Sequence, residues 1–205
     1  MENYSAKLTG EPFLYRETKI LGKYILDGYD IKSLKQKNID ENLIQYKSKN
    51  SIKRVNSAIF RRIGIMNEKM LNEFVYGDLY VSRMILLYTI MKTDRLVKDF
   101  VFEVYRNNIL LLKDFIEDYE IKNWLDDKIA SSSTLSNTSS LTQQKLKQVL
   151  TKIMVDSGLL VKNKDKYKIV IPIYSQKFEE MLLENNDIEY YRAIGGIVWK
   201  QYKKD

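Results

Sequence analysis

The side chains that most often perform catalysis or bind metals are missing from this sequence. It contains no cysteine and no histidine, which excludes a cysteine nucleophile, a thiolate zinc site and acid–base catalysis by histidine. It also lacks a glycine-rich phosphate loop, a dinucleotide-binding turn, a zinc-protease helix motif and a serine elbow. The carboxylates between Asp114 and Asp127 match no metal-ligand spacing and indicate a solvated surface. We therefore expect no enzymatic activity, no catalytic or metal site and no cofactor.

A basic segment near the amino terminus is the strongest candidate for a binding function. Residues 42–67 contain six Lys or Arg and no Asp or Glu. In a helix, Ile52, Val55, Ile59 and Ile63 would share one side, and most of the basic and polar residues would lie opposite. Lys and Arg neutralise phosphates, while Asn and Ser can reach base edges or sugar oxygens, so this face suits nucleic acid. The predicted DNA-contacting residues are Lys47, Lys49, Asn50, Lys53, Arg54, Ser57, Arg61 and Arg62.

An ordinary solvated helix face is the alternative interpretation of this segment, because amphipathic helices routinely carry charge on their exposed side. Such faces usually mix both signs of charge. The complete absence of acidic residues from residues 42–67 favours nucleic acid.

A second candidate surface lies towards the carboxyl terminus. We expect a helix from about Leu141 to Ser157 that stops at Gly158, followed by a hairpin with a lysine-rich turn. This order is typical of a winged helix, in which the wing can contact the phosphate backbone. Lysine-rich turns also serve simply as soluble strand edges, so both interpretations stay open. The predicted contacts are Gln144, Lys145, Gln148, Lys152, Lys164 and Lys166.

The remaining pattern predicts a mainly α protein, a compact helical bundle with one small β-hairpin wing. Eight glycines and two prolines in 205 residues are few, and apolar residues recur every three or four positions. A helix-turn-helix-like region is expected over about residues 28–66, with its basic helix at about 50–66. Asp94 is placed to cap the second of two strongly apolar helices. The other predicted helices are about 12–28, 31–37, 79–91, 96–112, 121–129, 176–183 and 188–202.

Residues 131–140 predict a division of the chain into two domains. Eight of these ten residues are Ser or Thr, which is typical of a flexible linker. We therefore expect an N-terminal helical domain over residues 1–130 and a C-terminal winged-helix-like subdomain over residues 131–205.

The charge distribution is compatible with a polyanionic partner. The net charge is +7, and the excess lies at the two ends: residues 1–66 contain 13 Lys or Arg and 7 Asp or Glu, and residues 131–205 contain 12 and 8. The amino terminus lacks the pattern of a signal peptide, and the apolar stretch from Met84 to Met91 is too short to span a bilayer. We expect a cytoplasmic protein without membrane contact.

Four stretches of the chain resemble the BrxA family of the BREX phage-defence systems. They are Leu8 to Thr18, Asn42 to Arg62, Arg83 to Arg106 and Lys145 to Leu160. No single stretch is diagnostic, and their order and spacing carry the resemblance. It implies a compact helical fold similar to NusB antitermination factors, no enzymatic activity and binding to duplex DNA.

Two other functions remain open at this point. The protein could be an adaptor for other BREX proteins, with basic faces that meet acidic partner surfaces. A NusB-like fold could also bind structured or single-stranded RNA. The oligomeric state and any DNA sequence preference are not indicated by the residues.

Overall fold

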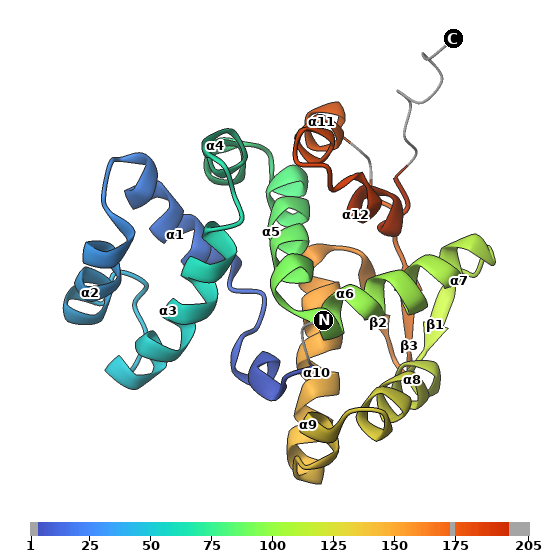
Figure 1. Cartoon of the computed structure of the whole chain (residues 1–205). Helices are drawn as coiled ribbons and strands as arrows, with labels where there is room; N and C mark the ends of the chain where they lie inside the picture. Colours follow the sequence, from blue (N-terminus) through green and yellow to red (C-terminus); the bar gives the residue numbers. More distant parts are fainter. Residues whose placement is uncertain (1–3, 173–174, 197–205) are drawn as a thin grey trace.

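The computed structural model describes residues 4–172 and 175–196, and it confirms the mainly α fold (Figure 1). The first half of the chain forms the 3-10 helix η1 (Ala6–Gly10), α1 (Tyr15–Leu26), α2 (Ile31–Glu41), α3 (Lys49–Ile63), α4 (Glu68–Tyr76) and α5 (Leu79–Thr93). The second half forms α6 (Arg95–Phe100), the π-helix η2 (Val101–Tyr105), α7 (Arg106–Leu110), α8 (Asp118–Ala130), α9 (Ser133–Ser136), α10 (Ser140–Ser157), α11 (Gln176–Glu184) and α12 (Ile188–Ala193). The strands are β1 (Phe115–Glu117), β2 (Leu160–Asn163) and β3 (Lys166–Ile169).

Helix α5 is the centre of the core. It is apolar on nearly all sides, and its residues from Met84 to Met91 are all buried, as expected for a helix that is surrounded by protein. It packs against α3, α4, α6 and α10. In Figure 1, α1 to α3 lie on one side of α5, and α6 to α8 with the sheet lie on the other.

The predicted cap at Asp94 is confirmed. Its carboxylate accepts a hydrogen bond of 3.1 Å from the amide of Val97 and so begins α6. The helix predicted for residues 96–112 instead consists of α6, the π-helical η2 and α7. It ends at Leu110, and Leu112 adopts a left-handed conformation with φ 55°.

The helix-turn-helix-like prediction rests on α2 and α3, which pack together. Asn38 of α2 and Asn56 of α3 form a buried hydrogen bond of 2.6 Å. Asn56 also donates to the main-chain oxygen of Lys35 at 3.1 Å. These polar contacts hold α3 in a fixed position against α2. Helix α4, which follows, was absent from the sequence prediction.

The predicted hairpin is confirmed as β2 and β3, and a third strand completes the sheet. The strand order is β1-β3-β2, with both pairs antiparallel, and Ile116 of β1 lies opposite Tyr167 of β3. Strand β1 has only three residues, so no alternation in the sequence could reveal it. The sheet therefore joins the middle of the chain to its carboxyl-terminal part.

The Ser-rich segment is ordered and contains α9, so its prediction as a flexible linker is wrong. Leu135 is fully buried, and the hydroxyl groups of Ser132 and Ser139 cap α9 and α10. Serine favours helix N-caps as well as linkers, which explains the misleading composition. The division into domains 1–130 and 131–205, and the winged-helix assignment of the second, stay predictions.

The helix predicted for residues 188–202 is described only in part, because residues 197–205 lie outside the described residues. Its first part is α12. In the described ranges, no helix combines the length and the hydropathy that crossing a bilayer would need.

Candidate nucleic-acid interface

Helix α3 has the two faces that its sequence predicts. Ile52, Val55, Ile59 and Ile63 are buried against the core. The opposite face and the segment leading into it are exposed, with the side chains of Lys47, Lys49, Asn50, Lys53, Arg54 and Ser57. We call these six residues the α3 basic surface.

The positive charges of the α3 basic surface are largely uncompensated. The structure gives Lys47, Lys49 and Lys53 no carboxylate partner in residues 4–172 and 175–196. The surface includes the amino-terminal turn of α3, where Ser48 caps the helix by accepting from the amide of Ser51 at 3.2 Å. A helix amino terminus carries partial positive charge, so it adds to the attraction for phosphate.

Two neighbouring residues extend or support this surface and were not predicted from the sequence. Lys35 of α2 is exposed, and its Nζ lies 5.4 Å from the ring centroid of Phe60 of α3. Gly10 lies under Arg54, since a Cβ atom at Gly10 would be only 3.1 Å from Arg54 Cδ. Only the packing of α2 and η1 against α3 reveals these relationships.

The prediction that Arg62 contacts DNA is wrong. Its side chain is buried, with 1% of the residue exposed, and its guanidinium donates to three main-chain oxygens of the segment before α1. The distances are 2.9 Å to Glu11, 2.8 Å to Pro12 and 3.0 Å to Phe13. Burial lowers the pKa of Arg62 to about 10, so it remains charged at neutral pH. Arg62 fastens the amino-terminal segment to α3.

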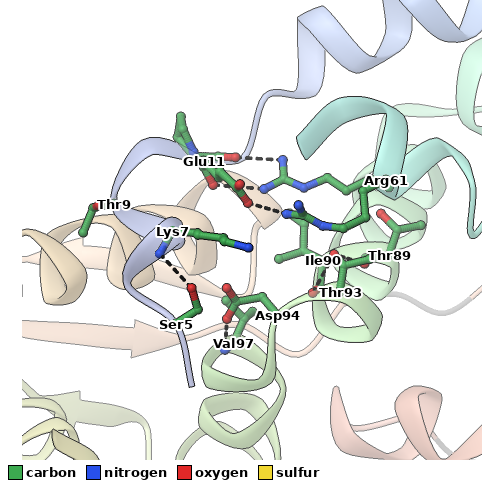
Figure 2. A network of polar contacts seen from close by, with 12 residues as sticks. Ser5, Lys7, Thr9, Glu11, Arg61, Thr89, Ile90, Thr93, Asp94 and Val97 are labelled. Atoms are coloured by element: carbon green, nitrogen blue, oxygen red, sulfur yellow. Dashed lines mark hydrogen bonds and ion pairs between the residues drawn. The ribbon is translucent and has the colours of Figure 1, made fainter. Parts of the chain in front are cut away.

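Arg61 is partly exposed but contributes little free charge. Its guanidinium pairs with the carboxylate of Glu11, as Figure 2 shows. In the same network, the carboxylate of Asp94 lies below the side chain of Lys7. Burial, and to a smaller extent the charge of Glu11, raise the pKa of Asp94 to about 6. This cluster is thus mainly structural, in contrast to the open α3 basic surface.

The polar face of α10 is exposed as predicted, although part of its charge is paired. Gln144, Lys145, Gln148 and Lys152 all face solvent. The Nζ atom of Lys152 lies 2.6 Å from the carboxylate of Asp156, one turn along the helix. Lys145 has no such partner among the residues described.

An open groove of about 630 Å³ runs between α10 and the β2–β3 hairpin. Three of the predicted residues, Gln144, Gln148 and Lys152, line it. The other lining residues include Lys147 of α10 and Lys162 of β2, which were not among the predicted contacts. Lys162 reaches this position only because the hairpin folds back onto α10. We call this feature the α10 groove.

The two lysines predicted at the tip of the hairpin have different surroundings. Lys164 is exposed at the turn, where its φ is 52°. Lys166 is half-buried, and its Nζ lies 4.1 Å from the ring centroid of Phe115. Neither residue lines the α10 groove.

The amino-terminal segment lies between the two surfaces. Helix η1 packs against α10, and Glu11 to Phe13 contact α3 through Arg62. The described residues include no group of three or more carboxylates that could hold a metal ion. The arrangement thus offers two separate polar surfaces, both suited to binding.

Comparison with known proteins identifies the family. The BrxA family model matches residues 2–186. The chain belongs to the BrxA family. This BrxA-family protein is 29% identical over 192 residues to "BREX protein BrxA" of Bacillus cereus (strain H3081.97), a match that covers 94% of this chain and 92% of the relative.

Two further proteins are less similar in sequence to this BrxA-family protein. "BREX protein BrxA" of Escherichia coli O9:H4 (strain HS) is 20% identical over 151 residues, covering 74% of this chain and 71% of the relative. The crystal structure of an uncharacterized protein from Magnetospirillum magneticum superimposes with a TM-score of 0.80 at 21% identity. That match covers 94% of this chain and 98% of the other, and it shows a shared fold.

Proposed function

We propose that this BrxA-family protein is a non-enzymatic accessory protein of a BREX anti-phage system and that it binds duplex DNA. Family membership and the names of the two curated relatives support the place in BREX. One observation supports DNA binding above all others. The α3 basic surface is exposed and lies in a stretch, residues 42–67, that contains no acidic residue.

Each part of the α3 basic surface has a distinct role in this proposal. Lys47, Lys49, Lys53 and Arg54 neutralise backbone phosphates. Asn50 and Ser57 are exposed on the same helix and can hydrogen-bond to sugars or base edges. The buried contacts of α3 with α2 and with residues 11–13 keep the helix rigid while it binds.

The salt dependence of binding to a labelled DNA duplex tests this proposal. Four neutralised phosphates give a slope of log affinity against log salt of roughly −3 to −4. The Lys53→Glu variant should bind about tenfold more weakly at low salt, because it loses a charge-assisted contact. The matched control is Lys122→Glu, which makes the same change at an exposed residue of α8. A slope near zero, or equal weakening by both substitutions, would contradict the proposal.

A second candidate function, an adaptor for other BREX proteins, is favoured by a different observation. The consecutive residues Leu110, Leu111 and Leu112 at the end of α7 are 67%, 69% and 90% exposed. Exposed apolar clusters often mark protein interaction sites. In Figure 1 the end of α7 projects from the edge of the molecule.

Co-purification distinguishes the adaptor from the DNA-binding protein. If BREX proteins remain bound after nuclease treatment and are released by Leu111→Ser/Leu112→Ser, the adaptor function is supported. If nuclease alone releases them, their association depends on DNA. RNA binding is tested separately, by competition between duplex DNA and RNA of equal length for the purified protein.

A further inference from the structure

The outer face of α10 is the floor of a groove and does not project from the molecule. Lys162 and Tyr167 of the hairpin line one part of the α10 groove, and Asp118 at the start of α8 lines another. Strand β2 and helix α8 both pack against α10. The helix is thus flanked by other elements along the face that carries Gln144 and Gln148.

This shape is poorly suited to reading duplex DNA. A helix with its side chains is about 10–12 Å across, and the major groove is about 12 Å wide, so the helix must enter the groove without flanking structure. A duplex that approaches this face would have to accommodate strand β2 and helix α8 beside α10. A narrower ligand, such as one strand or an unpaired base, can reach the floor.

The chemistry of the floor fits the edges of bases. Gln144 and Gln148 lie one helical turn apart, and neither side-chain amide has a hydrogen-bond partner among the residues described. By contrast, Thr151, also in the groove, already donates to the main-chain oxygen of Lys147 at 2.9 Å. A free amide offers both a donor and an acceptor, which a base edge can satisfy.

The walls of the groove supply positive and apolar surface. Lys162 is exposed and has no carboxylate partner within the described chain. Lys147 Nζ lies 2.5 Å from Asp118, so the only carboxylate lining the groove in the described structure is already neutralised. Val155 and the ring of Tyr167 add apolar surface. Cations beside aromatic and apolar surface are typical of sites for single strands.

We propose that the α10 groove binds an unpaired, single-stranded segment of nucleic acid. Gln144 and Gln148 contact base edges, and Lys162 contacts the phosphate backbone. The volume of about 630 Å³ lies within the range of roughly 300–1,000 Å³ that is usual for small-ligand sites. This inference rests on the proposed DNA-binding function and adds that the second surface takes a single strand.

Binding should be measured with three labelled probes: a single-stranded oligonucleotide, a plain duplex, and the same duplex with a central unpaired bubble. The intact protein should bind the bubble more tightly than the plain duplex. Lys162→Glu should weaken binding to the single strand about tenfold, because a charge-assisted contact is lost. The matched control is Lys122→Glu, which reverses an exposed charge of α8 outside the groove and should change that affinity by less than about twofold.

The conservative variant Gln144→Leu/Gln148→Leu removes the amides without changing charge. It should reduce binding to the single strand and the bubble, and leave the plain duplex unaffected. Unchanged single-strand binding in both groove variants would overturn the inference. Competition by polyglutamate as strong as competition by unlabelled single strand would also overturn it, since the groove would then be a general anion site.

The two proposals fail in different ways in this experiment. Lys53→Glu on the α3 basic surface should weaken duplex binding and leave the single strand bound. A protein that binds the single strand but never the plain duplex would contradict the proposed duplex function alone. A protein that binds the duplex with the predicted salt slope, yet shows no groove effect, would contradict only the inference about α10.

Discussion

Asn38 Nδ2 lies 2.6 Å from Asn56 Oδ1, and this buried hydrogen bond joins α2 to α3 behind the α3 basic surface. The remaining amide atoms of both residues are also satisfied. Asn38 accepts from the amide of Ile44 at 3.3 Å, and Asn56 donates to the main-chain oxygen of Lys35. A fully satisfied polar pair of this kind fixes one arrangement of the two helices.

Replacement of Asn56 by alanine should therefore destabilise the protein. Asn38 would lose its hydrogen-bond partner inside the core, which costs about 1–3 kcal/mol. Urea denaturation of Asn56→Ala measures this loss. Asn50→Ala, an exposed position on the same helix, should change stability by less than about 0.5 kcal/mol. Equal stability of the two variants would show that the buried hydrogen bond between Asn38 and Asn56 does not contribute to the free energy of unfolding.

Arg62→Met should mainly lower the free energy of unfolding, with a smaller effect on the free energy of DNA binding. The substitution removes three hydrogen bonds to the main chain of residues 11–13, with an expected loss of about 3 kcal/mol or more. Thermal unfolding of Arg62→Met and of the exposed Arg54→Met tests this difference. A direct role of Arg62 in DNA contact would instead give a stable variant with weakened binding.

The ionisation of Asp94 should make stability depend on pH between about 4 and 6. Its pKa is about 6 in the folded protein, above the ordinary value of 3.8, because the carboxylate is buried. The native state therefore holds the proton more tightly than the unfolded state does, and stability falls as the pH rises through this range. The loss is at most about 3 kcal/mol.

The Asp94→Asn variant provides the measurement for that pH dependence. Asparagine can still cap α6, but it does not ionise. The difference in unfolding free energy between the native protein and Asp94→Asn should change steadily from pH 4 to pH 6 and then level off. A constant difference over this range would show that Asp94 ionises normally.

Gly158→Ala should cost about 1–2 kcal/mol through backbone strain alone. Gly158 ends α10 with φ 90°, and no atom lies within 4 Å of a Cβ added there. Steric overlap is thus not a factor. Gly158→Asn should cost less, because asparagine adopts left-handed conformations more readily. Equal unfolding midpoints for the native protein, Gly158→Ala and Gly158→Asn would show that the left-handed conformation at this helix end places no demand on the residue.

The parts of the fold that local signals determine were predictable. Gly158 as the end of α10, Asp94 as a cap and the β2–β3 hairpin depend on residues near in sequence, and all three are confirmed. Strand β1 was not predicted because the strand with which it pairs, β3, lies far along the chain. Helix η2 was missed because a π-helical turn has no distinct sequence pattern.

The candidate site was predictable to a similar extent. The exposure of Lys53 and Arg54 follows from helical periodicity. The burial of Arg62 does not, since it depends on the segment from Glu11 to Phe13 crossing α3. The position of Lys162 in the α10 groove likewise depends on how the hairpin folds back.

The order β1-β3-β2 has a consequence for the growing chain on the ribosome. Strand β1 cannot pair until β3 has been synthesised. The interval between the synthesis of β1 and that of β3 is roughly 3–10 s at ~5–20 residues per second. Helix η1 must wait in the same way for α10, against which it packs. The amino-terminal helices emerge long before the sheet can close, so a chain released early, near residue 130, would leave Leu8 and Ile116 without their native cover.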